Sequence, residues 1–376
     1  MQELGVDFYK GNKVKLLMSG YEKFDHMFED IRQARSSVHL EYFNFRNDSI
    51  ASLLFDILRE KRKEGVEVRA LFDGFGNDSN NKPLRKRHLE ELHANGIDIH
   101  EFDPIRFPWI NHIWPRDHRK IVVIDGRIAY TGGMNVADYY LVGTEQVGEW
   151  HDMHCRIEGP AVNELQRIFA RMWKKVTKED IGDSKYYQAI PNGNKTIGIV
   201  NREPDEFCEI MRRFYLAAID YAQDSVKIIN PYFAAPNKVM RALKRCAKRG
   251  VKMDIIISAK YDEPLMPDIV MYNMRKLIKR GVRVWRYRPG FHHSKIMMVD
   301  GRLCTVGSAN LDSRGLYYDY EVNAVIPDTM TTRELEQKFL EDTRECDFVD
   351  MEEWNRSRTT WQRIRGWLGH LLTFLI

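Results

Sequence analysis

The chain has 376 residues, a length that exceeds one average domain and suits two. Hydrophobic residues make up 43% of it and charged residues 30%, with no low-complexity tract, so the composition is that of a globular protein. The formal net charge of +4 gives no clear support for a nucleic-acid-binding groove. No run approaches the ~20 apolar residues of a membrane-spanning helix, and the N-terminal segment lacks the apolar core of a signal peptide.

Cysteine usage limits the stabilising chemistry that we expect. Five cysteines are present, an odd number, and no two of them form a CxxC pair. The sequence therefore predicts reduced, buried thiols, and neither a disulfide framework nor a cysteine zinc site.

The chain repeats one pattern of elements. The matching β-rich segments of the two halves are Ser37–Phe43 with Ser225–Phe233, Glu64–Gly74 with Arg249–Ala259, and Asn95–Pro104 with Arg280–Pro289. Amphipathic helical runs that end at glycine separate these segments. Such alternation predicts an α/β fold of two duplicated sandwich domains. We expect the first domain at residues 1–185, the second at 186–350, and an amphipathic tail at 351–376.

A second repeated pattern follows these elements in each half. It reads HRKIVVIDGRIAYTGGMN from His118 and HSKIMMVDGRLCTVGSAN from His293. In an extended strand, the His and Lys of His-x-Lys point to one face because side chains alternate. The Asp-Gly pair predicts a tight hairpin turn, after which the returning strand brings the Asn near the His.

The residue types at these positions suit a phosphate site. A Lys ammonium and an Asn amide can hold phosphate oxygens, and a His can act as nucleophile or proton carrier near neutral pH. We therefore expect a catalytic site with two reactive histidines and four phosphate-binding residues. The candidates are His118 and His293 for reaction, and Lys120, Lys295, Asn135 and Asn310 for phosphate binding.

A carboxylate is expected to orient each histidine. Asp152 and Glu321 are the candidates, because each begins an apolar alternating run after the Asn loop. Asp125 and Asp300 lie instead at the far end of the buried strand, beside the turn, and we expect them to be structural. Core strands that carry His and Lys by chance are the alternative, and two complete copies in a duplicated scaffold argue against it.

At these residues the sequence resembles the phospholipase D superfamily, whose mark is two HxKx4D motifs. The resemblance implies two α/β halves about a pseudo-twofold axis, both histidines in one cleft, and no requirement for a metal or cofactor. It implies that His118 is the covalent nucleophile and His293 the general acid and then base. Within the superfamily the chain is most similar to bacterial cardiolipin synthases of the short type, through segments such as WHDMHCRIEGPAV and GSANLDSRGLYYDYEVN.

The resemblance also implies an activity. The expected enzyme is a phosphatidyltransferase that makes cardiolipin from two phosphatidylglycerols and releases glycerol, through a phosphohistidine intermediate. The alternatives are a phospholipase D that hydrolyses phospholipid, a phosphatidylserine synthase, a nuclease, or a non-catalytic lipid-binding scaffold. The expected partners are anionic phosphatidylglycerol and a membrane surface, without nucleic acid and with the oligomeric state open. The expected location is cytoplasmic, peripheral on the inner face of the cell membrane.

Two segments are candidate membrane contacts. The aromatic segment Phe107–Trp114 either enters the bilayer interface, lines an acyl channel, or covers the core between the halves. The C-terminal tail has the pattern of an interfacial amphipathic helix, with a helix packed on the second domain as the alternative. Its apolar positions are Trp361, Ile364, Leu368, Leu371, Leu372 and Leu375.

Overall fold

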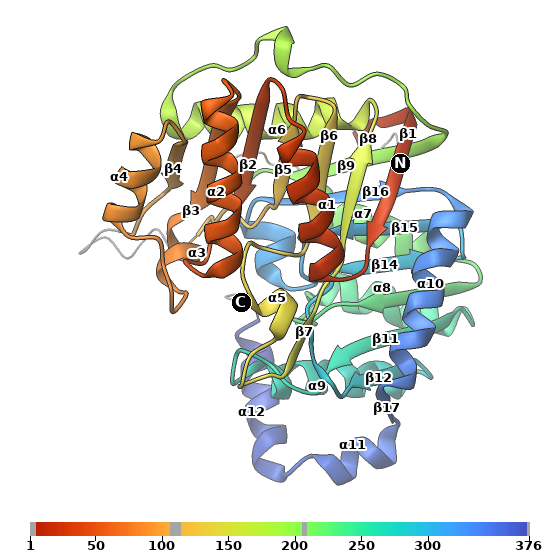
Figure 1. The fold of residues 1–376 in the computed structure, drawn as a ribbon. Helices are drawn as coiled ribbons and strands as arrows, with labels where there is room; N and C mark the ends of the chain where they lie inside the picture. Colours follow the sequence, from red (N-terminus) through yellow and green to blue (C-terminus); the bar gives the residue numbers. More distant parts are fainter. Residues whose placement is uncertain (1–4, 106–113, 205–208, 374–376) are drawn as a thin grey trace.

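The computed structural model describes residues 5–105, 114–204 and 209–373. Figure 1 shows two α/β lobes whose strands form one continuous sheet. This sheet has 15 strands, in the order β17-β12-β11-β10-β14-β15-β16-β9-β1-β8-β6-β5-β2-β3-β4. Among the residues that the structure describes, no helix combines the length and apolarity needed to cross a bilayer.

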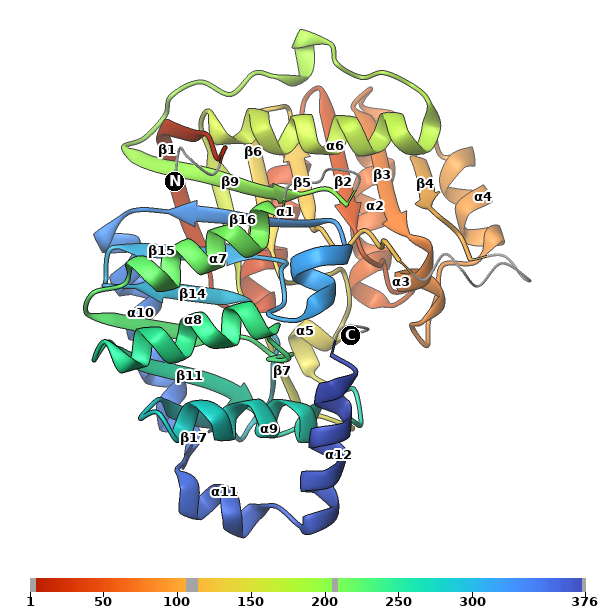
Figure 2. The same ribbon diagram turned by 180° about the vertical axis from the view of Figure 1, so that it is seen from behind.

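The first half contributes eight strands and six helices to the described chain. The strands are β1 (Phe8–Leu17), β2 (Ser37–Tyr42), β3 (Glu67–Asp73), β4 (Asp98–Phe102), β5 (Ile121–Ile124), β6 (Ile128–Gly132), β7 (Glu149–His151) and β8 (His154–Glu158). The helices are α1 (Gly20–Arg32), α2 (Ser49–Lys63), α3 (Gly74–Asp78), α4 (Lys86–Ala94), α5 (Tyr139–Val142) and α6 (Ala161–Thr177). Figures 1 and 2 show α1 and α2 on one face of the sheet and α6 on the other.

The second half repeats this arrangement. Its strands are β9 (Lys195–Arg202), β10 (Ser225–Ile229), β11 (Lys252–Ser258), β12 (Arg283–Tyr287), β13 (Gly290–His292), β14 (Ile296–Val299), β15 (Leu303–Gly307), β16 (Glu321–Ile326) and β17 (Cys346–Val349). Its helices are α7 (Ile210–Tyr221), α8 (Asn237–Lys248), α9 (Met266–Ile278), α10 (Thr329–Arg344), α11 (Met351–Ser357) and α12 (Thr360–Leu371). Helices α7, α8 and α9 cover one face and α10 the other (Figure 2).

The pairing order confirms the duplicated α/β fold. From the central antiparallel pair β1–β9, one direction runs β8, β6, β5, β2, β3, β4, and the other runs β16, β15, β14, β10, β11, β12. The parallel strands β2 and β10 lie within the sheet with helices on both faces, so their sequences SVHLEY and SVKII are rich in buried apolar residues. The expected boundary at 185/186 falls between α6 and β9, and the division into domains there stays a prediction.

The motif aspartates hold the hairpins to neighbouring strands. Asp125 and Asp300 occupy the β5–β6 and β14–β15 turns with φ of 52° and 54°. Asp125 accepts hydrogen bonds from the backbone N–H groups of Arg35, Ser36 and Ser37 at 2.7–3.1 Å. Burial raises the pKa of Asp125, but these N–H groups outweigh it and hold the pKa below the usual value. These contacts lie at the turn and at the neighbouring strand, away from the histidines, and a structural role for both aspartates stays a prediction.

Replacing Asp300 with Ala is expected to destabilise the second half. Asp300 accepts from the backbone N–H groups of Gln223, Asp224 and Ser225 at 2.7–3.2 Å, at the start of β10. Losing them, together with the strain of Ala at positive φ, should cost about 1–3 kcal/mol. Urea unfolding followed by circular dichroism measures this loss. Asp300→Asn, which keeps one acceptor oxygen and tolerates positive φ, should lose less, and an equal loss would contradict the account.

The C-terminal tail combines the two alternatives predicted for it: its helix packs on the second half and also exposes an apolar face. Helix α12 packs on α9 through Gly366 and Gly369, where an added Cβ would lie 2.4 Å from the Asp268 carbonyl oxygen and 2.6 Å from Ile269 Cγ1. Arg365 pairs with the buried Asp268 carboxylate at 2.6 Å. The opposite face is apolar and exposed. It carries Trp361, Ile364, Trp367, Leu368, Leu371 and Leu372, which are 41–64% exposed. Leu375 lies outside the described residues.

Candidate active site

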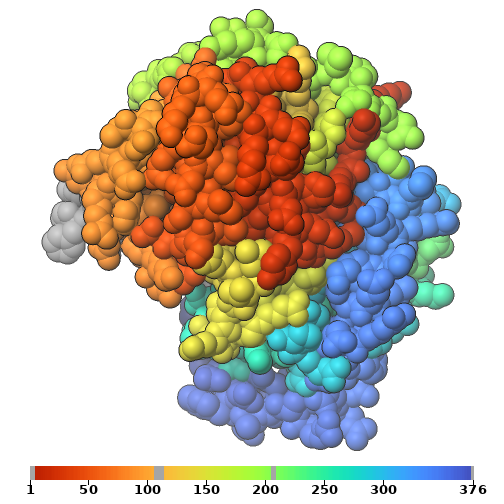
Figure 3. Space-filling model, in the orientation of Figure 1, coloured from red at the N-terminus to blue at the C-terminus, as the bar shows by residue number. Residues whose placement is uncertain are grey.

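Both motif histidines line one cavity of about 720 Å³ between the halves. Asn135, Asn310 and Glu321 line the same cavity. Figure 3 shows the segment that includes α5 and β7, in yellow, lying between the two lobes. The duplicated motifs, far apart in the sequence, therefore converge on one space.

The backbone of each histidine is anchored to the opposite half. His118 precedes β5, and its N–H donates to the Tyr320 carbonyl at 3.1 Å. His293 follows β13, and its N–H donates to the His151 carbonyl at 2.6 Å. The His-x-Lys segments lie just before β5 and β14, so the prediction that they form part of these strands is wrong. Arg119 points away from the site, as expected, and pairs with buried Glu41 at 2.7 Å.

The two carboxylates expected from the sequence contact the histidines across the halves. His118 Nδ1 lies 2.9 Å from Glu321 Oε1, and His293 Nδ1 lies 2.7 Å from Asp152 Oδ2. Each carboxylate directly follows the residue whose carbonyl holds the histidine backbone. Each half therefore supplies one histidine and orients the histidine of the other half.

A small residue of each motif lies beside the carboxylate, and it differs between the shorter Asp152 and the longer Glu321. A Cβ added to Gly133 would lie 2.4 Å from Asp152 Oδ1, so the absence of a side chain there admits this carboxylate. The matching position of the second motif is Ser308, whose hydroxyl donates to Glu321. Asp152 therefore has no hydroxyl donor at this motif position, whereas Glu321 has one.

The lysines and asparagines stand next to the histidines. Lys120 Nζ donates to the His118 carbonyl at 2.5 Å, and Lys295 Nζ lies 2.9 Å from both ring nitrogens of His293. The side-chain oxygens of Asn135 and Asn310 are buried and have no hydrogen-bond partner within the described part of the chain. All four candidate phosphate-binding residues are thus at the site. The two asparagine oxygens can accept a hydrogen bond from a ligand hydroxyl, whereas phosphate oxygens would be bound by the amide N–H groups.

Burial and positive charge lower the pKa of both histidines. Burial, and then Lys120, Lys295 and Arg314, hold the pKa of His118 well below its usual value. Burial and Lys295 lower the pKa of His293 to about 4, although the hydrogen bond and charge of Asp152 oppose that change. Burial also lowers the pKa of Lys120 to about 7 and that of Lys295 to about 8. Both imidazoles are therefore neutral at pH 7 before an anionic ligand binds.

The two orienting carboxylates differ in charge state. Burial raises the pKa of Asp152, but Lys295 and His293 outweigh it, so the pKa lies below the usual range and the group is ionised. For Glu321 burial dominates and raises the pKa to about 7, despite opposing effects of Lys120 and Ser308. His293 consequently faces a full negative charge at neutral pH, and His118 faces a carboxyl group near its midpoint.

Several cavity residues were not predicted from the sequence. Arg314, in a short helical turn at 314–318, binds Asp319 at 3.0 Å and lines the cavity. Phe43 and Trp150 lie against the two imidazoles, with centroid distances of 5.1 Å to His118 and 5.5 Å to His293. The sequence offered one indication for Arg314, its place between the candidate site residues Asn310 and Glu321. Residues 107–113 of the aromatic segment Phe107–Trp114, one of the two candidate membrane contacts, lie outside the described residues.

Comparisons with known proteins agree with this geometry. A family model described as "Cardiolipin synthase, PLD-like domain" matches residues 27–173 and 215–343. The cardiolipin synthase of Geobacillus sp. (strain WCH70) is 36% identical over 348 residues, covering 90% of this chain and 68% of that protein. Cardiolipin synthase 2 of Staphylococcus epidermidis is also 36% identical, covering 91% of this chain and 70% of that protein.

A solved structure shares the fold. The crystal structure of phosphatidylserine synthase from Haemophilus influenzae Rd KW20 matches with a TM-score of 0.78 at 15% sequence identity, covering 100% of this chain and 98% of that chain. At this identity the likeness shows the architecture alone. The family model and the sequence relatives go further, and by them the chain belongs to the PLD-like cardiolipin synthase family of the phospholipase D superfamily.

Proposed function

We propose that this protein is a phosphatidyltransferase that joins two phosphatidylglycerol molecules into cardiolipin and releases glycerol. The observation that carries the proposal is the pair of histidine–carboxylate contacts, 2.9 Å and 2.7 Å long, that cross between the halves on one cavity. Two histidines at one site allow a double displacement, in which one carries the phosphatidyl group and the other moves protons. Relatives named cardiolipin synthase support this substrate class.

Binding of the anionic phosphodiester favours uptake of one proton, which His293 holds beside ionised Asp152. In the first displacement, neutral His118 attacks the phosphorus of one phosphatidylglycerol, and protonated His293 gives this proton to the departing glycerol oxygen. In the second, the hydroxyl of another phosphatidylglycerol loses its proton to His293 and attacks the phosphorus, which frees His118. Lys120, Lys295, Asn135 and Asn310 would hold the phosphate oxygens and stabilise developing charge. Each displacement moves one proton through His293, so the cycle returns the enzyme to its starting state.

The electrostatics support His118 as nucleophile and His293 as acid and base. Asp152 is ionised and stabilises a proton on His293, whereas Glu321, with a pKa of about 7, offers less negative charge to His118. Three cations also oppose protonation of His118: Lys120, Lys295 and Arg314. A proton added to the site is therefore favoured on His293 and leaves His118 neutral for attack.

Product analysis tests this function. Purified full-length protein is incubated with phosphatidylglycerol vesicles without added divalent metal, and lipids and glycerol are quantified by mass spectrometry. Cardiolipin and glycerol in equal amounts are the expected result. Phosphatidic acid without cardiolipin would identify water as the acceptor and overturn the synthase proposal in favour of hydrolysis.

The rate is expected to fall at alkaline pH. Lys120 and Lys295, with pKa values of about 7 and about 8, are charged below those values and lose charge as the pH rises. Because kcat/KM reports the free enzyme, it should fall at least ~10-fold between pH 7 and pH 9. Initial rates on vesicles of fixed composition measure this. Lys295→Arg, which stays charged, should show a shallower decline, and a flat wild-type profile would contradict the account.

We further propose that α12 brings the cavity to the membrane surface. Helix α12 packs on α9, and Leu265, Met266 and Ile269 at the start of α9 line the cavity. Ile269, on which Gly369 of α12 packs, lines the cavity, and Leu265 at its rim is 57% exposed, so α12 lies beside an apolar part of the cavity wall. This arrangement suits a peripheral protein at the inner face of the cell membrane that takes lipids directly from the bilayer.

Replacing Trp361 and Trp367 with Ser is expected to weaken membrane binding. They are 64% and 48% exposed, and burying each indole in the interface should contribute on the order of 1–2 kcal/mol. Sedimentation with phosphatidylglycerol vesicles should show binding at least ~10-fold weaker. Tyr221→Ser, at the end of α7 and 76% exposed, is the matched control and should bind normally. Equal binding by the double variant would remove α12 from the proposed contact.

A further inference from the structure

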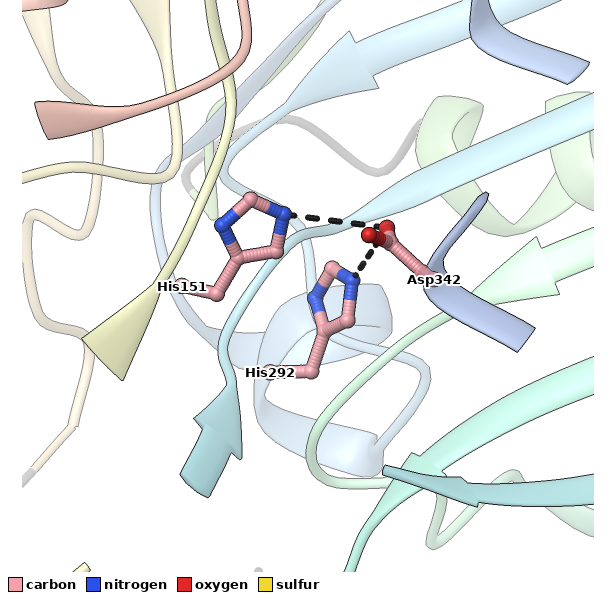
Figure 4. Close-up of side chains that lie close together, drawn as sticks. All are labelled: His151, His292 and Asp342. Carbon is pink, nitrogen blue, oxygen red and sulfur yellow. Dashed lines mark hydrogen bonds and ion pairs between the residues drawn. The ribbon is translucent and has the colours of Figure 1, made fainter. Parts of the chain in front are cut away.

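A second cluster of histidines and a carboxylate lies beside the active site. Strands β7 and β13 pair in parallel as a small separate sheet, with His151 opposite His292. Figure 4 shows both rings directed at the carboxylate of Asp342, on α10. Asp342 Oδ2 lies 3.1 Å from His292 Nε2 and 3.7 Å from His151 Nε2. All three side chains are buried, and one ligand atom from each lies within 4.8 Å of the others.

None of these three residues lines the cavity, and the proposed reaction assigns no role to their side chains. Nor do hydrogen bonds within the described chain satisfy the cluster. His151 Nε2 and His292 Nδ1 are buried without a hydrogen-bond partner there. Of these two atoms, His151 Nε2 faces the Asp342 carboxylate at 3.7 Å, whereas His292 Nδ1 lies on the side of its ring away from it. Buried polar atoms normally find partners, so the unpaired His151 Nε2 beside a buried carboxylate indicates a missing cationic ligand between them.

We propose that His151, His292 and Asp342 bind one divalent transition-metal ion, with Zn²⁺ as the best match. Two imidazole nitrogens and one carboxylate oxygen form a donor set that zinc accepts, whereas Mg²⁺ and Ca²⁺ prefer oxygen ligands alone. Tetrahedral bonds of about 2.0–2.1 Å place ligand atoms roughly 3.3 Å apart. The separations from the Asp342 oxygen, 3.1 and 3.7 Å, are close to this value, and the two histidine nitrogens, within 4.8 Å of each other, would have to approach by at most about 1.5 Å.

Neighbouring charged groups can orient the ligands. Lys338 Nζ binds the other oxygen of Asp342 at 2.7 Å, which leaves Oδ2 directed at the histidines. Glu149 Oε1 lies 4.0 Å from His151 Nδ1, the ring nitrogen turned away from Asp342. Such outer contacts typically fix the orientation of metal ligands.

The consequence would be a clamp between the halves. His151 belongs to the first half, and His292 and Asp342 to the second, so one ion would cross-link the two. His151 immediately precedes Asp152, and His292 immediately precedes His293, the pair in contact at 2.7 Å. The ion would therefore hold these two residues in register without taking part in phosphoryl transfer.

Metal titration tests the proposal. The full-length protein is treated with chelator, dialysed and titrated with Co²⁺, whose visible absorption reports coordination, and Zn²⁺ is then added as competitor. One equivalent of Co²⁺ should bind with a four-coordinate spectrum, in which water is the fourth ligand, and Zn²⁺ should displace it. His151→Gln and His292→Gln should each weaken binding at least ~100-fold. His100→Gln is the matched control, since His100 also contacts a carboxylate, Asp98 at 2.7 Å, outside this cluster, and it should bind like wild type.

Two results would overturn the proposal. One is a wild-type protein that takes up no stoichiometric Co²⁺ or Zn²⁺, a result that does not depend on whether any variant folds. The other is stoichiometric binding that both histidine variants, shown to be folded by circular dichroism, leave unchanged. Melting temperatures give a second readout, which should rise with Zn²⁺ concentration in the wild type and the His100 variant but not in His292→Gln.

Discussion

His118→Asn is expected to lower cardiolipin formation by at least ~10⁴-fold, because it removes the nucleophile that carries the phosphatidyl group. His293→Asn should cost ~10²–10⁴-fold, the usual contribution of a general acid and base. Mass spectrometry of cardiolipin from phosphatidylglycerol vesicles measures both losses. His26→Asn, on α1 outside the cavity, is the matched control and should retain wild-type activity.

A substrate with a good leaving group separates the two roles. Nitrophenolate needs no proton to depart, so phosphatidyl-p-nitrophenol does not require an acid in the first displacement. His293→Asn should therefore still release nitrophenolate, up to about one equivalent per site, while His118→Asn should release none. The opposite pattern would exchange the roles of the two histidines.

Asp152→Asn is expected to lower kcat by ~10²–10⁴-fold, because it removes the charge that stabilises a proton on His293. Glu321→Gln should cost less, and least below pH 7, where Glu321 with its raised pKa of about 7 is already largely protonated. Gln can also keep the hydrogen bond from Ser308. Rates of both variants at pH 6 and pH 8 measure the difference.

Normal folding, checked by circular dichroism, is the control for both variants. If Asp152→Asn and Glu321→Gln lost the same activity at pH 6 and at pH 8, the two carboxylates would act alike, which would contradict the proposed difference in their charge states. A larger loss for Glu321→Gln than for Asp152→Asn would assign the proton-carrying role to His118 instead.

The sequence predicted the architecture of each half well, because local signals determine it. The repeated segments, together with the glycines that end the amphipathic helices, predicted the alternation of strands and helices that the structure has. The joining of the two sheets could not be predicted in the same way. It depends on β1 and β9, each the outermost strand of its own half, whose pairing in the middle of the sheet is a long-range contact with no motif to mark it.

The structure brings together the site residues that the sequence singled out, but their contacts with one another were not predicted. The motifs identify His118, His293 and their lysines, yet residue types do not say which half supplies each carboxylate. The crossed contacts arise because Tyr320 and His151 bind the histidine backbones from the opposite half. The cluster around Asp342 gave no sequence signal, since its members are scattered along the chain and only the fold brings them together.

Trapping the covalent intermediate tests the central claim most directly. The protein is mixed with phosphatidylglycerol labelled at phosphorus, quenched in alkali, where phosphohistidine survives, and digested for peptide mass spectrometry. The account predicts a label on the peptide that contains His118, which is absent in His118→Asn and passes into cardiolipin when unlabelled phosphatidylglycerol is added. Cardiolipin made at the full rate with no label on His118 would contradict it.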